Sequence, residues 1–250
     1  MEISLTQMDE RACSYDVSLG IALHNARGKC YPMALQRLAI GVVETHLARI
    51  GLDAPKLVRE HGVSWVLLSF SAEQLQPLSP DRTYRAQTWH TSLKGPVFRR
   101  DFVITDGDTP VVVGATYSTL LDVKKRRICT DRTLLAPFLA LHGEELLTAE
   151  HRWRENLPFT AVETRRVRPS WIDGLGHVNN MRYAELAYDA LSEAEQQKID
   201  DFRRMDVYFI HELTANELFT VEKAEKESAI VLRGMCAGGT QPSFVVELTY

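Results

Sequence analysis

The residues best suited to chemistry lie together in one short loop of the second half of the chain. Asp173 supplies a carboxylate, and His177, four residues later, supplies an imidazole that can accept or donate a proton near neutral pH. Gly174 and Gly176 lie between them. Two glycines this close together permit a tight turn and let a ligand approach the backbone. The spacing therefore indicates an acid and an imidazole held on one tight loop.

Two amides and a helix follow this loop. Asn179 and Asn180 come directly after it, and Asn is a favoured residue at a helix N-cap. Apolar residues then recur at helical spacing, which predicts a helix over residues 181–191: Met181, Ala184, Ala187, Tyr188 and Leu191. The free N–H groups and positive dipole end of such a helix suit an anion or a developing oxyanion. The alternative interpretation is a glycine-rich surface loop with a surface histidine.

Composition and charge exclude several functional classes. The chain has 250 residues, 45% hydrophobic and 25% charged, which is enough for one large domain or two small ones. A net charge of −4 and a pI near 6.1 argue against a general nucleic-acid binder. No stretch approaches the roughly 20 apolar residues that span a bilayer, so no membrane insertion is expected. Residues 1–10 carry acids without an apolar core, which argues against a secretory signal and favours the cytoplasm.

The four cysteines are expected to be free thiols. They are widely separated and form no C-x-x-C pair: Cys13, Cys30, Cys129 and Cys236. This pattern favours a reducing cytoplasm and argues against both a disulfide framework and a zinc site. The sequence also has no G-x-S-x-G, H-E-x-x-H or G-x-x-x-x-G-K-[ST] motif, which argues against serine hydrolases, zinc enzymes and nucleotide binders of those types. We therefore expect no metal and no organic cofactor.

The first half of the chain predicts a long helix followed by several strands. Pro32 suits the first turn of a helix, and apolar residues continue on one face to Ile50 before Gly51 ends it. Strands are expected over residues 14–24, 64–71, 83–91, 97–105 and 110–121. A helix with antiparallel strands joined by short turns is an α+β layout. It fits a hotdog fold, in which a curved antiparallel sheet wraps around one long central helix.

The second half repeats this order after a connector. Residues 126–157 form the connector, in which residues 134–147 predict a helix. Further strands are expected over residues 160–168, 205–212, 218–224, 229–236 and 243–249. We therefore expect an N-terminal repeat over residues 1–125 and a C-terminal repeat over residues 158–250.

The helix entries of the two halves align without a gap. The alignment sets residues 25–33 against residues 173–181, with Gly28 on Gly176 and Met33 on Met181. Asn25 and Lys29 then stand where the second half has its acid and its imidazole. We interpret the chain as two tandem hotdog repeats, of which the first keeps the scaffold and has lost the acid–imidazole pair. The one site of the chain is then expected in the second repeat.

The run D-x-x-x-H-V-N-N-x-x-Y resembles the active-site signature of the acyl-acyl carrier protein (acyl-ACP) thioesterases, which have a tandem hotdog fold. The resemblance covers roughly residues 12–250 and includes residues 65–92 and 205–221. It implies two sets of site residues: Asp173, His177 and Glu212 in catalysis, and Asn179 and Asn180 in positioning the substrate or its oxyanion. The chain departs from the family at Leu175, where an Asn is frequent, and at Leu213, where plant members carry a cysteine. A cysteine nucleophile is therefore absent at that position.

The resemblance implies that the protein hydrolyses fatty acyl-ACP to a free fatty acid and holo-ACP, a reaction that ends fatty acid synthesis. Its partner is then an acyl carrier protein that carries a fatty acyl chain. We expect a carboxylate, Glu212 or Asp173, to act as base or transient nucleophile, while His177 orients water or protonates the leaving thiolate. Helix-terminal N–H groups near Asn179 and Asn180 would hold the oxyanion, which contributes roughly 3 kcal/mol in comparable sites.

Several points stay open at this stage. Five aromatic residues are candidates for an acyl tunnel: Trp65, Phe70, Trp89, Phe98 and Phe102. Four basic runs are candidates for docking an acidic carrier protein: Lys124–Arg127, Arg99-Arg100, Arg165-Arg166 and Arg203-Arg204. His211, beside Glu212 on a predicted strand, is expected on the opposite face. Two other functions are an acyl-CoA thioesterase on the same fold and a non-catalytic acyl-binding protein. A monomer and a homodimer are both compatible with the sequence, because a double hotdog already contains the pairing that single-hotdog chains obtain by dimerising.

Overall fold

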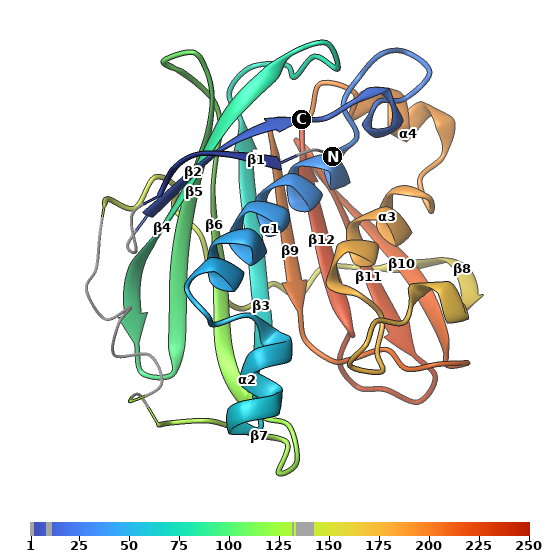
Figure 1. Cartoon of the computed structure of the whole chain (residues 1–250). Helices are drawn as coiled ribbons and strands as arrows, with labels where there is room; N and C mark the ends of the chain where they lie inside the picture. Colours follow the sequence, from blue (N-terminus) through green and yellow to red (C-terminus); the bar gives the residue numbers. More distant parts are fainter. Residues whose placement is uncertain (1–2, 9–11, 132, 134–142) are drawn as a thin grey trace.

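The fold is built on one continuous 12-stranded sheet in which every pairing is antiparallel (Figure 1). The structure is a computed structural model that describes residues 3–8, 12–131, 133 and 143–250. The strand order is β1-β2-β4-β5-β6-β3-β9-β12-β11-β10-β8, and the short β7 pairs with β6. The bounds are β1 Ile3–Met8, β2 Ala12–Ser18, β3 Val63–Gln74, β4 Thr83–Lys94, β5 Val97–Asp106, β6 Thr109–Asp122, β7 Arg127–Ile128, β8 Thr160–Arg166, β9 Arg204–Phe209, β10 Leu218–Lys226, β11 Ala229–Cys236 and β12 Phe244–Thr249.

The strands predicted from the sequence are confirmed, with shifted ends. The entry strand expected over residues 14–24 is β2, which ends earlier, and a 3-10 turn over Ile21–Leu23 follows it. The strand expected over residues 205–212 is β9, which ends at Phe209. Residues 229–236 form β11 as predicted.

Two hotdog repeats share this sheet, as expected. Strands β1–β6 precede the connector, the short β7 lies at its start, and β8–β12 follow it. The repeats meet where β3 pairs antiparallel with β9, from Ser69↔Tyr208 to Glu73↔Arg204. The exact residue boundaries of the two repeats and the connector stay a prediction.

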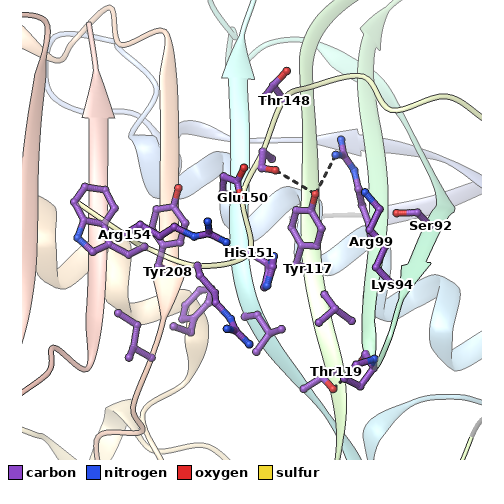
Figure 2. Close-up of a pocket in the computed structure, with 18 of the residues that line it drawn as sticks. Ser92, Lys94, Arg99, Tyr117, Thr119, Thr148, Glu150, His151, Arg154 and Tyr208 are labelled. Atoms are coloured by element: carbon purple, nitrogen blue, oxygen red, sulfur yellow. Dashed lines mark hydrogen bonds between the residues drawn. The ribbon is translucent and has the colours of Figure 1, made fainter. Parts of the chain in front are cut away.

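The described part of the connector runs over the outer face of the sheet at this junction (Figure 2). Sheet side chains donate hydrogen bonds to four successive connector carbonyls: Arg99 to Leu147 (2.6 Å), Arg204 to Thr148 (2.9 Å), Tyr117 to Ala149 (3.1 Å) and Ser69 to Glu150 (2.8 Å). The helix expected over residues 134–147 lies mostly outside the described residues, and its described end, residues 143–147, is not helical. The connector backbone is therefore held by side chains of the sheet.

A buried ion pair anchors this arrangement. Arg99 and Asp101 of β5 are 2% and 0% exposed, and two guanidinium nitrogens donate to the two carboxylate oxygens at 2.8 and 2.9 Å. Asp101 Oδ1 also accepts from the backbone N–H of Leu146 at 3.1 Å. Burial lowers the pKa of Arg99, but the hydrogen bond and charge of Asp101 outweigh burial and leave the pKa raised. Arg99 thus stays a cation inside the protein.

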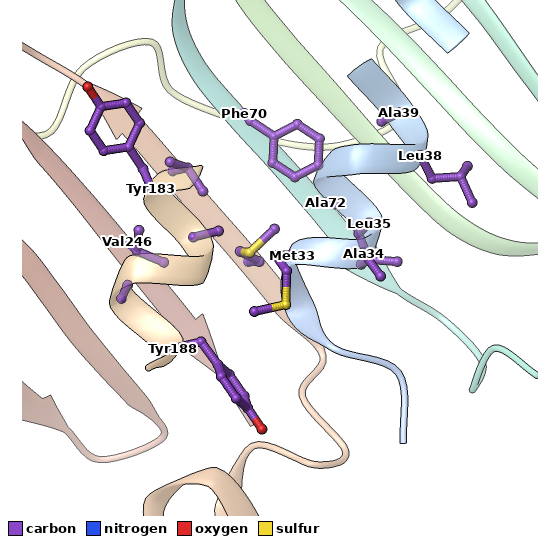
Figure 3. Packing of buried hydrophobic residues seen from close by; sticks show 14 of the residues in the cluster. Met33, Ala34, Leu35, Leu38, Ala39, Phe70, Ala72, Tyr183, Tyr188 and Val246 are labelled. Atoms are coloured by element: carbon purple, nitrogen blue, oxygen red, sulfur yellow. The ribbon is translucent and has the colours of Figure 1, made fainter. Parts of the chain in front are cut away.

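The first repeat contains the expected long helix, α1 (Pro32–Arg49). Pro32 occupies the first turn, where its missing N–H costs no hydrogen bond, and Gly51 follows the helix with a positive φ of 74°. The helix buries Leu35 and Leu38 completely. Figure 3 shows α1 beside the corresponding helix of the second repeat, with Phe70 of β3 between helix and sheet. A second helix, α2 (Ala54–His61), was not predicted; Asp53 caps it by accepting from the N–H of Lys56.

The helix predicted over residues 181–191 is present, but it is shorter than a long central helix. A 3-10 turn over Asn180–Arg182 leads into α3 (Tyr183–Tyr188), which ends before Leu191. Ser192 then starts α4 (Glu193–Lys198) with a capping box, in which its side chain accepts from the N–H of Glu195. The apolar spacing continues past Tyr188, but the cap at Ser192 begins a new helix there.

The predicted alignment of the two helix entries holds at the level of single hydrogen bonds. Asn25 N donates to Lys29 O at 2.8 Å, and Asp173 N donates to His177 O at 2.9 Å. In each loop the first side chain accepts from the N–H two residues later: Asn25 from Arg27, and Asp173 from Leu175. The residues that precede these loops form matching 3-10 turns, Ile21–Leu23 and Pro169–Trp171. The duplication is therefore present in the backbone, although few side chains are shared.

Removing the cation of the buried pair should destabilise the protein strongly. We expect Arg99→Ala to lower the free energy of unfolding by about 3–5 kcal/mol, because Asp101 would stay buried without its partner. The matched control is Arg59→Ala on α2, where an exposed arginine should matter by less than about 0.5 kcal/mol. Urea unfolding of both variants tests this, and a loss below about 1 kcal/mol for Arg99→Ala would contradict the role of the pair.

Candidate functional site

The loop of residues 173–177 is a compact turn stabilised by its own acid. Asp173 Oδ1 accepts from the N–H of Leu175 at 2.8 Å, and Gly176 N donates to Asp173 O at 3.1 Å. Gly176 has a φ of 92°, a conformation that favours glycine. The side chain of His177 is thereby fixed on the same side of the turn as the carboxylate, with 3.8 Å between its Nδ1 and Asp173 Oδ1.

The segment after β9 brings the second carboxylate to this histidine. Val178 N donates to Leu213 O at 2.8 Å, and the backbones of His177 and Thr214 form an isolated antiparallel β-bridge. Glu212 Oε1 then lies 3.5 Å from His177 Nε2. The imidazole therefore lies between two carboxylates, and its side chain is 21% exposed. The structure brings together the three residues that the sequence proposed as catalytic, although their roles stay a prediction.

One expectation about this segment was wrong. His211 was expected to point away from Glu212, but both residues line the same pocket. The reason is that β9 ends at Phe209, so side-chain alternation does not continue to residue 212. Ile210 and His211 instead both donate their backbone N–H to Ser243 O. His211 is thus a pocket residue that the strand pattern concealed.

Sequence reasoning also missed a cation at the site. Arg126, from the turn between β6 and β7 at the start of the connector, forms an ion pair with Glu212 Oε2. The other oxygen of Glu212 faces His177. The basic run Lys124–Arg127 indicated positive charge but gave no signal for this contact, which joins positions 86 residues apart.

The two asparagines have different surroundings. Asn179 Oδ1 accepts from the N–H of Met181 at 2.9 Å and so caps the 3-10 turn. The backbone carbonyl of Asn180 accepts from Gln36 Nε2 of α1 at 3.0 Å, and Asn180 lines both cavities of the site. Asn180 is therefore better placed than Asn179 to contact a bound molecule, whereas the side chain of Asn179 is committed to the cap.

Two adjoining cavities meet at the site. The smaller, about 130 Å³, is lined by His177, Glu212 and Asp173. The larger, about 570 Å³, lies against α1 and is mostly apolar. Asp173 and Asn180 line both. A volume of this size is in the usual range for small-molecule pockets. A molecule with a reactive head in the first cavity could place an apolar tail in the second.

The aromatic candidates divide between this cavity and the rest of the protein. Trp65 and Phe98 line the larger cavity. Phe70 and Phe102 instead stack on each other in the main core, with ring centroids 5.8 Å apart. Trp89 donates to the carbonyl of Glu144 in the connector. Two of the five aromatic residues are thus positioned to contact a bound apolar chain.

A larger hollow lies elsewhere and is lined by none of the candidate catalytic or substrate-positioning residues. It has a volume of about 1290 Å³ and lies between the connector and the outer face of the sheet, where Figure 2 shows Arg99, Tyr117 and His151. It is open and polar, and it lacks the acid–imidazole pair. We therefore place the candidate site at the smaller cavities.

Three neighbours of the catalytic candidates are Tyr183, Leu213 and Leu175. Tyr183 is 3% exposed, and its hydroxyl oxygen accepts from the N–H of Leu213 at 3.4 Å. Burial raises the pKa of Tyr183, with smaller contributions from the charges of Glu212 and Asp173, so the hydroxyl stays neutral. Leu213 is fully buried, whereas Leu175 is exposed and lines both cavities.

Within the described residues, no three His, Cys, Asp or Glu side chains are grouped as metal ligands. Three of the four cysteines, Cys30, Cys129 and Cys236, are free thiols. In the same part of the chain, no helix is long and apolar enough to cross a membrane.

The different roles of the two asparagines can be tested by measuring the free energy of unfolding of alanine variants. Asn179→Ala removes the cap and should lower the free energy of unfolding by about 1 kcal/mol. Asn180→Ala keeps the backbone carbonyl that Gln36 contacts, so it should change stability by less than about 0.5 kcal/mol. Urea unfolding of the two variants measures this, and the reverse order would contradict the assignment of the cap.

Two solved structures that superpose on nearly the whole chain are acyl-ACP thioesterases. An acyl-ACP thioesterase from Bacteroides thetaiotaomicron superposes with a TM-score of 0.81 at 16% identity, over 97% of this chain and 99% of that chain. The 12:0-ACP thioesterase from Umbellularia californica gives a TM-score of 0.82 at 12% identity, over 98% of both chains. No protein-family model and no curated protein sequence matches the chain. The chain therefore has the tandem hotdog fold found in the acyl-ACP thioesterases.

Proposed function

We propose that this protein is a thioester hydrolase that releases a fatty acid from acyl-ACP. The observation that carries this proposal is the histidine held between two carboxylates at the end of an apolar cavity. A thioester joins an apolar chain to a polar arm, so its carbonyl belongs where the two cavities meet. The similarity to solved acyl-ACP thioesterases supports the same assignment.

The geometry supports a mechanism by direct attack of water. Glu212, as general base, takes a proton from a water molecule, which attacks the thioester carbonyl. The tetrahedral oxyanion is stabilised by hydrogen-bond donors near Asn180. The C–S bond then breaks, and His177 donates a proton to the leaving thiolate while Asp173 orients the imidazole. The products are a fatty acid and the free thiol of the carrier. The 3.5 Å between Glu212 and His177 is long for a hydrogen bond, but such contacts often tighten when substrate binds.

Other parts of the proposal follow from the reaction. The partner is acyl carrier protein, the chemistry requires no cofactor, and the reaction ends fatty acid synthesis in the cytoplasm. Glu212 and His177 are contributed by the same chain, so catalysis is compatible with a monomer or a homodimer. The competing enzyme is an acyl-CoA thioesterase, which differs only in the carrier of the thiol.

The first test is hydrolysis of a chain-length series of acyl-ACPs, with the same acyl-CoAs in parallel. We expect turnover of acyl-ACP, and we expect His177→Ala and Glu212→Gln each to lower kcat by roughly 100-fold or more, because each removes a proton-transfer group. Thermal unfolding checks that both variants stay folded. Preference for acyl-CoA would move the assignment to the competing enzyme. Tight binding of acyl ligands without turnover would indicate a non-catalytic acyl-binding protein.

A second prediction concerns the length of the acyl chain. Ala48 of α1 lines the larger cavity, so Ala48→Phe should fill part of the space that the chain needs. We expect kcat/KM for the longest accepted chain to fall about 10-fold or more, with the optimum about two carbons shorter, since each buried CH₂ contributes about 0.8 kcal/mol. The control, Ala48→Ser, adds little volume and should keep the optimum. An unchanged chain-length profile in Ala48→Phe would show that the acyl chain lies elsewhere.

A further inference from the structure

The turn between β6 and β7 carries concentrated positive charge on an acidic protein. Residues 124–127 have the sequence Lys-Lys-Arg-Arg and are all exposed, whereas the whole chain has a net charge of −4. In each of the other basic runs at least one arginine is buried or ion-paired within the protein: Arg99 and Arg100 are buried, Arg165 pairs with Glu163, and Arg204 pairs with Asp206. Within residues 124–127, Lys125 pairs with Asp122 at 3.3 Å but stays 77% exposed, and Arg126 pairs with Glu212. We call residues 122–128 the basic hairpin.

The backbone of the basic hairpin is fixed by hydrogen bonds. Asp122 Oδ1 accepts from the N–H groups of Lys124 at 3.1 Å and Lys125 at 2.9 Å. Arg126 N donates to Asp122 O at 2.9 Å, and Val123 N donates to Gly62 O at 3.0 Å. These bonds hold the turn against α2 and β3, so the charges project from an ordered tip.

The basic hairpin also forms part of the wall of the proposed active site. Leu121 and Val123 line the smaller cavity together with His177 and Glu212. Arg126 reaches across to pair with Glu212, while Lys124, Lys125 and Arg127 surround it on the turn. Ile128, at the end of the hairpin, is 51% exposed, which gives the charged tip an apolar neighbour. A mixed basic and apolar surface is therefore located beside the reacting groups.

We propose that the basic hairpin is the docking surface for the acidic face of an acyl carrier protein. This proposal rests on the proposed function, since it names where the carrier of the thioester binds. An acidic carrier is repelled by a protein of net negative charge, except where a local basic patch attracts it. A patch beside the catalytic cavity steers the carrier to the position from which its acyl arm can enter. Lys124, Lys125 and Arg127 supply this attraction, while Arg126 stays with Glu212.

The test is reversal of the three docking charges with Arg126 left intact. We expect the triple variant Lys124→Glu, Lys125→Glu and Arg127→Glu to lower kcat/KM for acyl-ACP at least 10-fold at low ionic strength, mainly through KM. The salt dependence of the wild-type KM should be largely lost, because exposed charges are screened over about 10 Å at 0.1 M salt. Hydrolysis of an uncharged acyl-pantetheine should stay unchanged, which also checks that the variant is folded.

A matched control reverses three charges on the outer-face hollow instead. Lys94→Glu, Arg152→Glu and Arg154→Glu change the formal charge by the same amount at residues that line that hollow. We expect this variant to keep the wild-type KM for acyl-ACP. A milder double variant, Lys124→Gln with Arg127→Gln, avoids a new carboxylate beside Asp122 and should raise KM in the same direction by a smaller factor.

The outcomes separate this proposal from the proposed function. An unchanged KM for acyl-ACP in the hairpin variants, or a larger effect of the control on the outer face, would overturn the docking surface. An equal loss on acyl-ACP and acyl-CoA would also overturn it, because the hairpin would then recognise the phosphate of the arm that both share. Absence of acyl-ACP hydrolysis in the wild-type protein would instead refute the proposed function.

Discussion

The antiparallel pairing of β3 with β9 is the interaction on which the rest of the structure depends. It joins two repeats into one sheet, and its residues are buried on both faces: Phe70 and Val207 on the core face, Ser71 and Asp206 on the other. Ser71 Oγ donates to Asp206 Oδ1 across this pair at 2.6 Å, so even the polar residues are satisfied. The segment that follows β9 carries Glu212, and β3 supplies Trp65 to the cavities. A shift of this pairing by one residue would turn these side chains to the opposite face.

The connector explains why the outer face of the sheet carries buried charged side chains at this junction. Two arginine–aspartate pairs, Arg99–Asp101 on β5 and Arg204–Asp206 on β9, lie under the connector. Both arginines also donate to connector carbonyls. A backbone that crosses a sheet without joining it as a strand still needs donors for its carbonyls. The sheet supplies them from side chains, so the polar composition of this face is a consequence of the connector.

Duplication gave two loops with the same backbone and different surroundings. In the first repeat, Asn25 and Arg27 bind Asp200, and Lys29 binds Asp201, so residues of the second repeat cover the loop. In the second repeat, the equivalent loop faces cavities. The long helix α1 borders the larger cavity, whereas the short α3 supplies Tyr183 to the smaller one. The two repeats therefore contribute different parts of the site, with the α1 wall of the larger cavity from the first and the acid–imidazole pair from the second.

Local patterns predicted most of the fold and part of the site. Strands such as β11 follow from a run of apolar residues, and the loop of Asp173 and His177 follows from its glycines, because both depend on neighbours in sequence. The apolar spacing predicted a helix that continues to Leu191. The prediction gave too little weight to a local signal, the N-cap residue Ser192, which starts a new helix. The position of His211 could not be predicted, since it depends on where β9 leaves the sheet. The contact of Arg126 with Glu212 depends on tertiary register, which single-sequence patterns do not contain.

That last contact shows that the site draws on a residue outside the second repeat. Asp173 and Glu212 place two negative charges around one imidazole. Arg126, at the start of the connector, provides a compensating charge. It does so from a backbone φ of 53°, a conformation that costs a non-glycine residue about 1 kcal/mol. The Arg126 side chain is 55% exposed and that of Glu212 34%, so their ion pair contributes at most about 1 kcal/mol, which is comparable to that cost. A residue outside the second repeat therefore contributes a charge to the acid–imidazole pair.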